Sequence, residues 1–307
     1  MIAGAFDIGG TNIKYGVLNE KGDILYKSKT ATKASEGGMA IIGQVKELAK
    51  CLQADYELSG IAISTAGQIN KQEGSVIYAT ESLPGYTGLN IKKELEMAFD
   101  LPVAVDNDVN CSALGEYWRG AAQGVDQFLC MTLGTGIGGA IIMDGRVYNG
   151  AAYSAGEFGH MTLYPGGNPC LCGDKGCYEQ YASSRALEQR AQVYFKRSIS
   201  LLALFNNAKN GDQAAEMVIY KWIDDVALGI KSLVHIFNPP LIVIGGGVSE
   251  QGDYLLEKLQ KSVNARIMPS FQRSLELKLA QNGNDANLQG AVYQLYEYEL
   301  NQKVEGM

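Results

Sequence analysis

Short apolar runs alternate along the chain with amphipathic segments, a pattern typical of α/β proteins. In the first half, residues 60–67 and 101–107 are apolar enough for buried strands, and residues 39–52 carry apolar side chains at helical spacing. The start of the chain reads strand, glycine turn, strand, turn and strand, which predicts an antiparallel meander. The other elements predicted in this half are strands over 2–8, 13–19 and 24–30 and helices over 88–99 and 108–122.

The second half begins with the same arrangement. Residues 127–133 predict a strand, 134–139 a glycine turn, and 140–151 a strand, a tight turn and another strand. This order matches that of residues 2–26, so the pattern predicts an internal duplication of one domain type. Residues 241–249 predict a buried strand that runs into a third glycine turn. The remaining predicted elements are helices over 183–196, 213–237, 253–265 and 287–300 and a strand over 275–280. Strands that alternate with helices predict an α/β fold.

Composition narrows the class of protein. A chain of 307 residues is long enough for two packed domains. No apolar run could span a bilayer, and the first residues enter a strand without a basic region, so we expect no membrane segment and no signal peptide. The net charge of −7 and the pI near 5.0 argue against a nucleic-acid-binding protein. Cys51, Cys111 and Cys130 lie in apolar contexts, which predicts reduced core cysteines of a cytoplasmic protein.

One short segment, residues 155–179, concentrates metal-binding chemistry. It contains His160, Cys170, Cys172 and Cys177, and a structural zinc ion takes four such thiolate and imidazole ligands. The segment is also rich in glycine and proline, so a bound metal would supply its folding free energy. The alternative is three buried free thiols and a hydrogen-bonded core histidine. The clustering of three of the six cysteines with one histidine favours a structural Zn²⁺ site.

Two carboxylates flank these residues. Glu157 precedes His160 by one helical turn, and Glu179 follows the last cysteine of the cluster. A zinc ion would fix the positions of both carboxylates, so the segment predicts a ligand pocket beside the metal.

Three glycine clusters follow predicted strands. Asp7 and the glycines after it predict a phosphate-binding turn in which Asp7 holds Mg²⁺ through water, although any tight hairpin also favours Gly-Gly. The turn 134–139 is not a Walker A loop, and a strand follows it, which excludes a dinucleotide fingerprint. Two such turns on duplicated domains would clamp a triphosphate. The glycines at 245–247 would let an adenosine lie against the backbone.

Asn107 and Asp108 fall where a strand meets a helix. A carboxylate there can accept the proton of a substrate hydroxyl while that oxygen attacks a γ-phosphate. The alternative is an ordinary helix cap. Together with the glycine turns and the two glutamates, this pair predicts phosphoryl transfer to a polyol, because glutamate and imidazole groups match sugar hydroxyls as hydrogen-bond partners.

The sequence resembles the ROK family of bacterial sugar kinases and repressors over nearly its whole length. The motifs that carry the resemblance, in family order and spacing, are DIGGT (7–11), VDNDVN (105–110), LGTGIGG (133–139), AGEFGHM (155–161), CLCGDKGCYE (170–179) and IVIGGGVS (242–249). The resemblance implies the actin-like, hexokinase-like ATPase fold with two RNase-H-like domains around an interdomain cleft. We place the N-terminal domain at 1–118 with a closing helix at 290–307, and the C-terminal domain with the zinc loop at 119–289.

The resemblance also implies ATP with Mg²⁺ as cosubstrate and Asp108 as general base. It implies zinc held by His160 and the three cysteines, with the second ring nitrogen of His160 facing the sugar. The residues expected to hold the sugar are Gly67, Asn107, Asp108, Glu157, His160 and Glu179. The residues expected to hold the nucleotide are Asp7, Gly9, Gly10, Thr11, Asn12, Lys14, Gly134, Thr135, Gly136, Gly138, Gly245, Gly246 and Gly247.

The sequence leaves the acceptor sugar open. Ala66–Gly67 stands where many family kinases have Pro-Gly, and Ser82–Leu83 where they have Asn-Leu. The runs at 233–250 and 283–293 resemble β-glucoside kinases, whereas ISTAG (63–67) with VDNDVNC resembles N-acetylmannosamine kinases.

We expect an ATP-dependent kinase acting on the 6-hydroxyl of glucose or of a β-glucoside such as cellobiose. The alternatives are an N-acetylmannosamine kinase and, in another class, a sugar-sensing regulator. Because the DIGGT motif begins at Asp7, we expect no N-terminal helix-turn-helix of the kind found in the family's repressors. The family resemblance also predicts a homodimer.

Overall fold

The computed structural model describes the backbone of residues 2–305 and the side chains of residues 2–297. The chain forms two compact units. The first unit comprises Met1–Gly124, Arg146–Ala155 and Gln281–Met307, and the second comprises Val125–Gly145 and Gly156–Ala280. The last two residues of the closing helix predicted over 290–307 lie outside the described residues. No helix among residues 2–305 combines the length and apolar character needed to cross a membrane.

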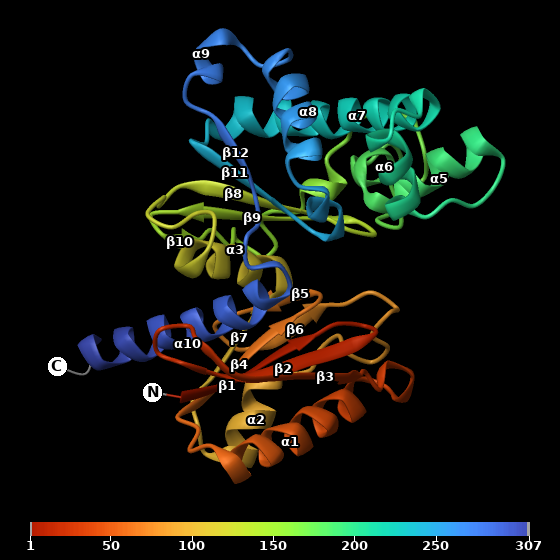
Figure 1. Ribbon diagram of the computed structural model, residues 1–307. Helices are drawn as coiled ribbons and strands as arrows, with labels where there is room; N and C mark the ends of the chain where they lie inside the picture. Colours follow the sequence, from red (N-terminus) through yellow and green to blue (C-terminus); the bar gives the residue numbers. More distant parts are fainter. Residues whose placement is uncertain (1, 306–307) are drawn as a thin grey trace. The chain divides into compact units, whose positions relative to one another are not determined.

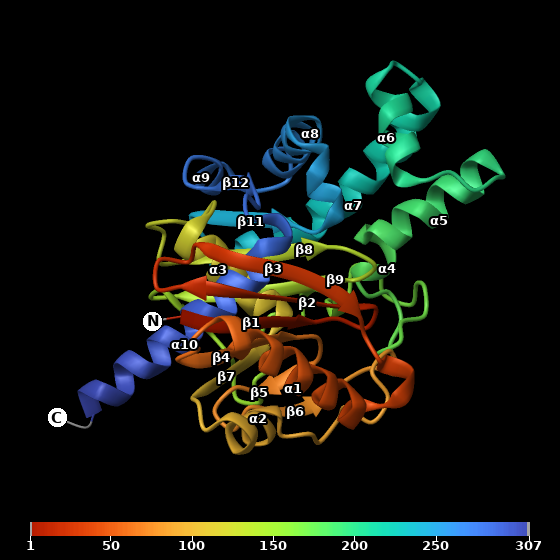
Figure 2. The same ribbon diagram turned by 60° about the horizontal axis from the view of Figure 1, so that its bottom comes forward.

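A five-stranded sheet forms the centre of the first unit, in the order β3-β2-β1-β4-β7. The predicted meander is present, because β1 pairs antiparallel with β2, and β2 pairs antiparallel with β3. The strands β4 and β7 extend the sheet in parallel with β1 (Figure 2). The strand bounds are β1 Ile2–Ile8, β2 Asn12–Asn19, β3 Ile24–Ala31, β4 Gly60–Thr65 and β7 Val103–Asn107.

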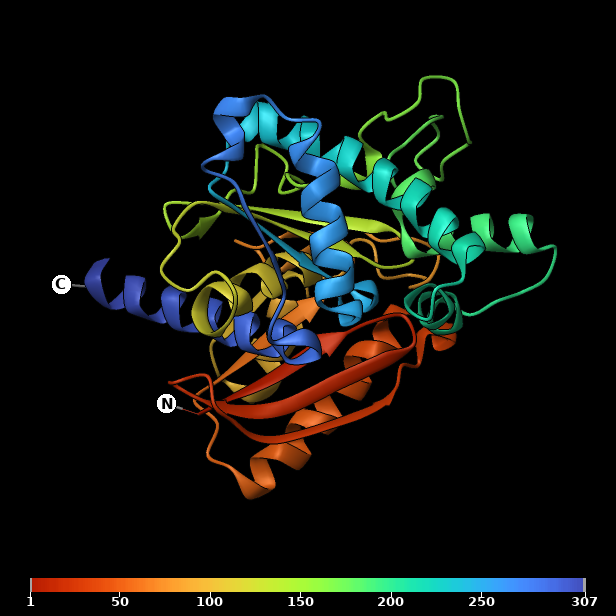
Figure 3. The ribbon, with the colours of Figure 1, turned by 45° about the horizontal axis from the view of Figure 1, so that its top comes forward.

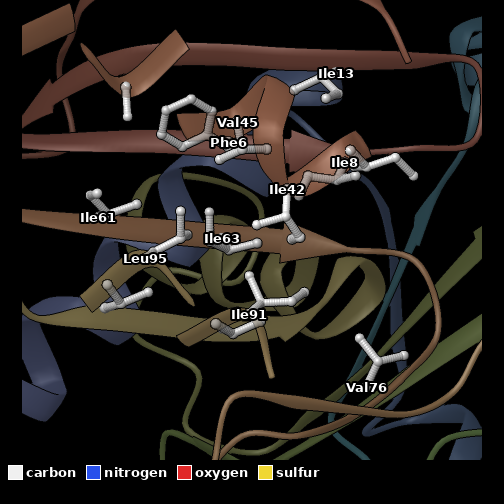
Figure 4. Packing of buried hydrophobic residues seen from close by; sticks show 14 of the residues in the cluster. Phe6, Ile8, Ile13, Ile42, Val45, Ile61, Ile63, Val76, Ile91 and Leu95 are labelled. Atoms are coloured by element: carbon white, nitrogen blue, oxygen red, sulfur yellow. The ribbon is translucent and has the colours of Figure 1, made fainter. Parts of the chain in front are cut away.

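The two faces of this sheet carry side chains of different size. Successive strand residues point to opposite faces, so Phe6 and Ile8 lie on one face and Ala3 and Ala5 on the other. The large side chains pack against α1 (Gly38–Asp55) and α2 (Ile91–Phe99), as Figure 4 shows. Each such buried side chain stabilises the fold by about 1.5–3 kcal/mol.

The alanine face packs against α3 (Asp108–Arg119) and α10 (Ala286–Glu305), which lies across the sheet from α1 in Figure 1. Small side chains on this face let both helices approach the sheet closely. The approach between the helices is also close, since a Cβ atom on Gly290 would lie 1.7 Å from the carbonyl oxygen of Cys111. The shorter elements of the first unit are η1 Ala34–Glu36, the hairpin β5 Gln68–Asn70 and β6 Ser75–Tyr78, β10 Arg146–Val147 and η4 Gly283–Asp285.

The second unit repeats the strand pattern of the first. Strand β8 (Phe128–Leu133) pairs antiparallel with β9 (Ile137–Met143) and parallel with β11 (Leu241–Gly245), which pairs parallel with β12 (Glu276–Leu279). In the first unit, β1 likewise pairs antiparallel with β2 and parallel with β4, which pairs parallel with β7. The two sheets therefore share the topology that the predicted duplication requires.

The longest helix of the second unit is α7 (Gln213–Phe237), whose bounds match the predicted 213–237. It buries an apolar stripe that includes Trp222, Ile223 and Val226, and it ends at Asn238 in the left-handed conformation before two prolines. Helices α7 and α8 lie on the same side of the sheet (Figure 3). The remaining elements are η2 Phe158–His160, α4 Glu179–Ala182, α5 Ser184–Phe195, α6 Leu201–Lys209, η3 Gly247–Gln251, α8 Asp253–Asn264 and α9 Pro269–Gln272.

Two details correct the sequence predictions. The glycine turn predicted over 134–139 is shorter, because β9 already begins at Ile137. The strand and glycine turn predicted over 241–249 are present, because β11 ends at Gly245 and Gly246 adopts a φ of 86° that an extended strand does not allow. Cys51, predicted to be a core residue, is exposed on α1, whereas Cys111 and Cys130 are buried as predicted.

Candidate functional site

In the first unit, polar side chains line up where the parallel strands end. Asp7 of β1 pairs in register with Ser64 of β4, and Ser64 pairs in register with Asp106 of β7. All three residues are buried, with at most 7% of each exposed. The carboxyl ends of parallel strands are where α/β folds bind ligands. This sheet edge is therefore the candidate functional edge of the first unit.

Asp7 is held by donors from three other elements. Its Oδ1 accepts hydrogen bonds from Ser64 Oγ at 2.8 Å and from Asn287 Nδ2 at 3.0 Å. Its Oδ2 lies 3.4 Å from Lys14 Nζ, which also donates to Asn284 Oδ1 at 2.9 Å. One carboxylate oxygen is thus saturated by neutral donors. The other has a single long contact and could take a water molecule of a hydrated cation.

The turn after β1 is short and exposes its backbone. Residues 9–11 connect β1 to β2, and Thr11 and Asn12 are exposed. The turn is closed by a hydrogen bond from Gly9 N to Asn12 O at 3.1 Å and is fixed by Thr32 Oγ1, which donates to Gly9 O at 2.7 Å. Gly10 adds no side chain beside these peptide groups. Such a turn can present N–H groups to an anion.

Asn107 and Asp108 form the junction between β7 and α3. Asn107 is the N-cap, and its Oδ1 accepts from Val109 N at 2.8 Å. Its Nδ2 donates to the carbonyl oxygen of Gly67 at 2.9 Å, which joins two predicted sugar-binding residues. Gly67 has a φ of 110°, and a Cβ atom there would lie 2.8 Å from Tyr78 O, so this position requires glycine. Asn107 therefore serves as the helix N-cap, so the Asp108 carboxylate is not needed for that role.

Burial, together with the negative charge of Asp7, raises the pKa of Asp108 to about 6. The carboxylate of Asp108 accepts a hydrogen bond from the backbone N–H of Val109 at 3.0 Å. A carboxyl group with a pKa near working pH is suited to general base catalysis, because it is ionised at neutral pH yet holds a proton more strongly than an ordinary aspartate. The neighbouring Asp106 differs from Asp108 in its hydrogen bonds, because its Oδ1 accepts from both Asn107 N and Asn110 Nδ2.

In the second unit, Glu179 joins the second glycine turn to the cysteine cluster. Its Oε2 accepts from Ile137 N at 3.4 Å, and a Cβ atom on Gly136 would lie 2.7 Å from that oxygen. Its Oε1 accepts from Cys170 Sγ at 3.4 Å. The turn is further fixed at Gly134, whose carbonyl oxygen accepts from both the N and the Oγ of Ser184. Thr135 and Gly138, also predicted to bind nucleotide, belong to this turn and to β9.

His160 and the three cysteines converge as the sequence predicted. Their ligand atoms all lie within 4.8 Å of one another. His160 Nδ1 lies 3.6 Å from Cys170 Sγ, and Cys172 Sγ lies 3.5 Å from Cys177 Sγ. The other ring nitrogen of His160 points elsewhere, 3.9 Å from Glu157 Oε2. One imidazole can therefore serve the cluster through Nδ1 and face another group through Nε2.

The donor set fits zinc. Three thiols and one imidazole match a tetrahedral structural site. Burial raises the pKa values of Cys170 and Cys177, whereas the backbone N–H of Asp174 lowers that of Cys172. A divalent cation among these sulfurs would favour all three thiolates. When bound, zinc would fix the loop that carries Glu157 and His160.

The third glycine cluster lies at the end of β11. Gly246 and Gly247 are exposed, and nothing lies within 4 Å of a Cβ atom on Gly247. Gly246 packs against the end of β8, where a Cβ atom would lie 2.4 Å from Leu133 O. The open backbone here could contact a flat ligand such as a nucleoside.

Hydrogen bonds and an ion pair anchor the loop that carries the cysteine cluster to the helices of the second unit. Tyr164 donates to Asp225 Oδ1 of α7 at 2.6 Å, and Arg190 of α5 pairs with the other carboxylate oxygen. Tyr181 stacks edge-on against Tyr164 and accepts from Asn168 N at 2.6 Å. These residues line a groove of about 810 Å³ that contains none of the predicted site residues.

The sequence analysis did not identify the residues that hydrogen-bond to Asp7 and Lys14 or that anchor the loop with the cysteines. These are Ser64, Asn284 and Asn287 in the first unit and Tyr164, Arg190 and Asp225 in the second. Two of the runs singled out in the sequence contain some of them: ISTAG (63–67) contains Ser64, and the segment 283–293, which resembles β-glucoside kinases, contains Asn284 and Asn287.

The comparisons with known proteins agree with this arrangement. A glucokinase from Halalkalibacterium halodurans is 34% identical over 313 residues, which covers 95% of this chain and 94% of that protein. A β-glucoside kinase from Listeria monocytogenes is 32% identical over 300 residues, with 96% and 97% covered.

Solved structures share the fold over nearly the full length. A ROK family glucokinase from Streptomyces griseus, in complex with glucose and AMPPNP, has a TM-score of 0.82 and 32% identity and covers 95% of this chain and 98% of its own. A Listeria monocytogenes protein proposed to be an N-acetylmannosamine kinase has a TM-score of 0.85 and 31% identity, with 97% and 100% covered. The predicted α/β, actin-like ATPase fold is confirmed. The ROK family model matches residues 3–297, and the chain therefore belongs to the ROK family.

Proposed function

We propose that this protein transfers the γ-phosphoryl group of ATP to the 6-hydroxyl of glucose or of a β-glucoside such as cellobiose. The chain is an ATP-dependent carbohydrate kinase of the ROK family. The observation that carries the proposal is Asp108, which lies at a sheet edge beside Asp7 with its pKa raised to about 6. Asp108 would take the proton of the acceptor hydroxyl as that oxygen attacks the γ-phosphate.

The nucleotide would be bound by the glycine turns. We assign the phosphates to the turn after β1, with Thr11, Asn12 and Lys14, and to Gly134–Gly138 of the second unit. The exposed backbone at 245–247 would take the adenosine. Magnesium, when bound with ATP, would neutralise phosphate charge, and Oδ2 of Asp7 would accept a hydrogen bond from a metal-bound water molecule. The open coordination of that oxygen supports this role.

We assign the sugar to the residues that the family resemblance implies, which are Gly67, Asn107, Asp108, Glu157, His160 and Glu179. The Nε2 atom of His160 faces away from the cysteine cluster, which supports a role in donating to or accepting from a hydroxyl. A structural zinc ion on Nδ1 and the three cysteines would hold this ring in place.

An acceptor panel tests the proposal. ADP release would be followed with glucose, cellobiose, N-acetylmannosamine and 6-deoxyglucose at matched concentrations. We expect turnover with glucose or cellobiose and none with 6-deoxyglucose, which lacks the reacting oxygen. Preferred turnover of N-acetylmannosamine would replace the acceptor by the second candidate, which the resemblance to the Listeria protein favours. Sugar binding without ADP release from any acceptor would support a sugar-sensing regulator and overturn the kinase assignment.

The finer organisation of the protein is also a proposal. We propose that the N-terminal domain of 1–118 with 290–307 carries the general base and that the domain of 119–289 carries the zinc loop. We further propose a cytoplasmic homodimer. Light scattering of the purified protein would test the second statement, and a mass of one 33.1 kDa chain at micromolar concentration would contradict it.

A further inference from the structure

The start of α10 reaches the functional edge of the first unit from the far end of the chain. Asn287, in the first turn of that helix, donates Nδ2 to Asp7 Oδ1 at 3.0 Å across 280 residues of sequence. Asn284, just before the helix, accepts from Lys14 Nζ at 2.9 Å. Two asparagines near the start of α10 therefore contact Asp7 and Lys14, the charged residues on either side of the turn 9–11, which we call the phosphate turn.

This segment is itself firmly anchored. The carboxylate of Glu116 on α3 is fully buried and accepts from Gln281 N at 3.0 Å and Asn282 N at 2.8 Å. Asp285 pairs with Lys27 of β3 at 2.8 Å. Charge-assisted hydrogen bonds to a buried carboxylate are strong, so the backbone that carries Asn287 is fixed to α3 and to the sheet.

The hydrogen bonds to Asp7 are asymmetric. Oδ1 takes both neutral donors, Ser64 and Asn287, whereas Oδ2 has, among the side chains of residues 2–297, only the long contact to Lys14. Without the Asn287 amide, the carboxylate could rotate about χ2, a soft torsion, and pair closely with the ammonium group of Lys14. That ion pair would occupy the free carboxylate oxygen.

We propose that Asn287 is a positioning residue for the Mg²⁺–nucleotide complex. It orients Asp7 so that Oδ2 faces the hydrated metal, while Asn284 holds Lys14 ready for a phosphate. The inference rests on the proposed role of Asp7. The unsaturated coordination of Oδ2 is the feature of this structure that fits a hydrated cation.

The test is calorimetric binding of the non-hydrolysable ATP analogue AMPPNP, with and without Mg²⁺. Loss of one hydrogen bond to a charged group corresponds to a change of about tenfold or more in affinity. We expect Asn287→Leu to reduce the affinity gained from Mg²⁺ by about tenfold and to leave metal-free binding within about twofold of wild type. The KM for Mg·ATP should rise, while the KM for the sugar should stay the same.

Gln289→Leu is the matched control. Gln289 lies two residues further along α10 and donates to Gly22 O at 3.2 Å, away from Asp7. The Gln289→Leu variant should leave the Mg²⁺ dependence of AMPPNP binding unchanged. Ser64→Ala removes the second donor to the same oxygen from another element and should shift the Mg²⁺ dependence in the same direction, which keeps the proposal testable if Asn287→Leu does not fold.

Two results would contradict the proposal, and they can be told apart. If Asp7→Asn keeps the wild-type Mg²⁺ dependence, the proposed role of Asp7 is wrong, and the inference fails with it. If Asp7→Asn loses that dependence but Asn287→Leu and Ser64→Ala keep it, Asp7 acts as proposed and Asn287 is only structural.

Discussion

Replacing Asp108 with Asn should abolish most turnover while leaving the fold and sugar binding intact. The substitution keeps the shape of the side chain and the acceptor for Val109 N, but it removes the group that can accept a proton. General base catalysis contributes about 10²–10⁴-fold, equivalent to about 3–5 kcal/mol of barrier. We therefore expect kcat to fall by two to four orders of magnitude, with sugar affinity measured by calorimetry nearly unchanged.

The raised pKa of Asp108 sets the pH range over which this effect should appear. With a pKa of about 6, about one tenth of the free enzyme would be active at pH 5, whereas an ordinary aspartate with a pKa of about 3.9 would be more than nine-tenths ionised. The acid limb of kcat/KM should therefore have its midpoint near pH 6. A midpoint near pH 4, or turnover of Asp108→Asn within about tenfold of wild type, would refute the assignment.

Stability provides an independent check. Because the pKa of Asp108 is higher in the folded protein than in the unfolded chain, its ionisation costs stability above pH 6, and this cost disappears as the pH falls below the unfolded value. Asp108→Asn should then have an unfolding midpoint at pH 7.5 at or above that of wild type. The control is Asp100→Asn, which neutralises an exposed carboxylate at the end of α2, where asparagine tolerates the φ of 53°. It should leave both kcat and the pH profile unchanged.

Three further predictions follow from the remaining contacts. Cys177→Ser, or prolonged chelation, should remove about one equivalent of zinc by elemental analysis and weaken sugar binding more than nucleotide binding; full metal content in the variant would contradict the site. Tyr164→Phe leaves the buried Asp225 short of one donor, so denaturant unfolding should show a loss of about 1–3 kcal/mol, with exposed Tyr194→Phe as control. Gly290→Ala forces a Cβ atom against Cys111 O and should cost about 1–3 kcal/mol or more, whereas Gly43→Ala, with nothing within 4 Å, should be neutral or stabilising.

The fold could be predicted where periodicity is long or strands are uniformly apolar. Helix α7 was predicted to the residue, because its stripe runs for seven turns and two prolines stop it. The glycine turn at 134 was predicted too long, because glycine is compatible with both a turn and a strand and only the pairing partner decides. Helix α6 and the β5–β6 hairpin were missed, because short elements depend on tertiary packing more than on local pattern.

The candidate site was predictable only where its residues are close in sequence. The cluster of His160 and three cysteines spans eighteen positions, from His160 to Cys177, so its spacing was visible. The bond from Asn287 to Asp7 joins the two ends of the chain, and no local pattern marks it. The return of Arg146–Ala155 to the first unit was also unpredictable, because a segment of ten residues carries no signal of the unit it will pack with.

The closeness of α3 and α10 is a structural requirement for the positioning proposed here. Gly115 and Gly290 lie where the two helices meet, and neither position has room for a side chain. A Cβ atom on Gly115 would lie 2.1 Å from Ala286 O. Ala286 immediately precedes Asn287, so any residue larger than glycine at 115 must displace the first turn of α10 from α3. The amide of Asn287 would then withdraw from Asp7, although neither glycine touches the phosphate turn. Helix packing and nucleotide binding in the first unit should therefore weaken together, and a Gly115→Ala protein that folds should share the altered Mg²⁺ dependence of Asn287→Leu.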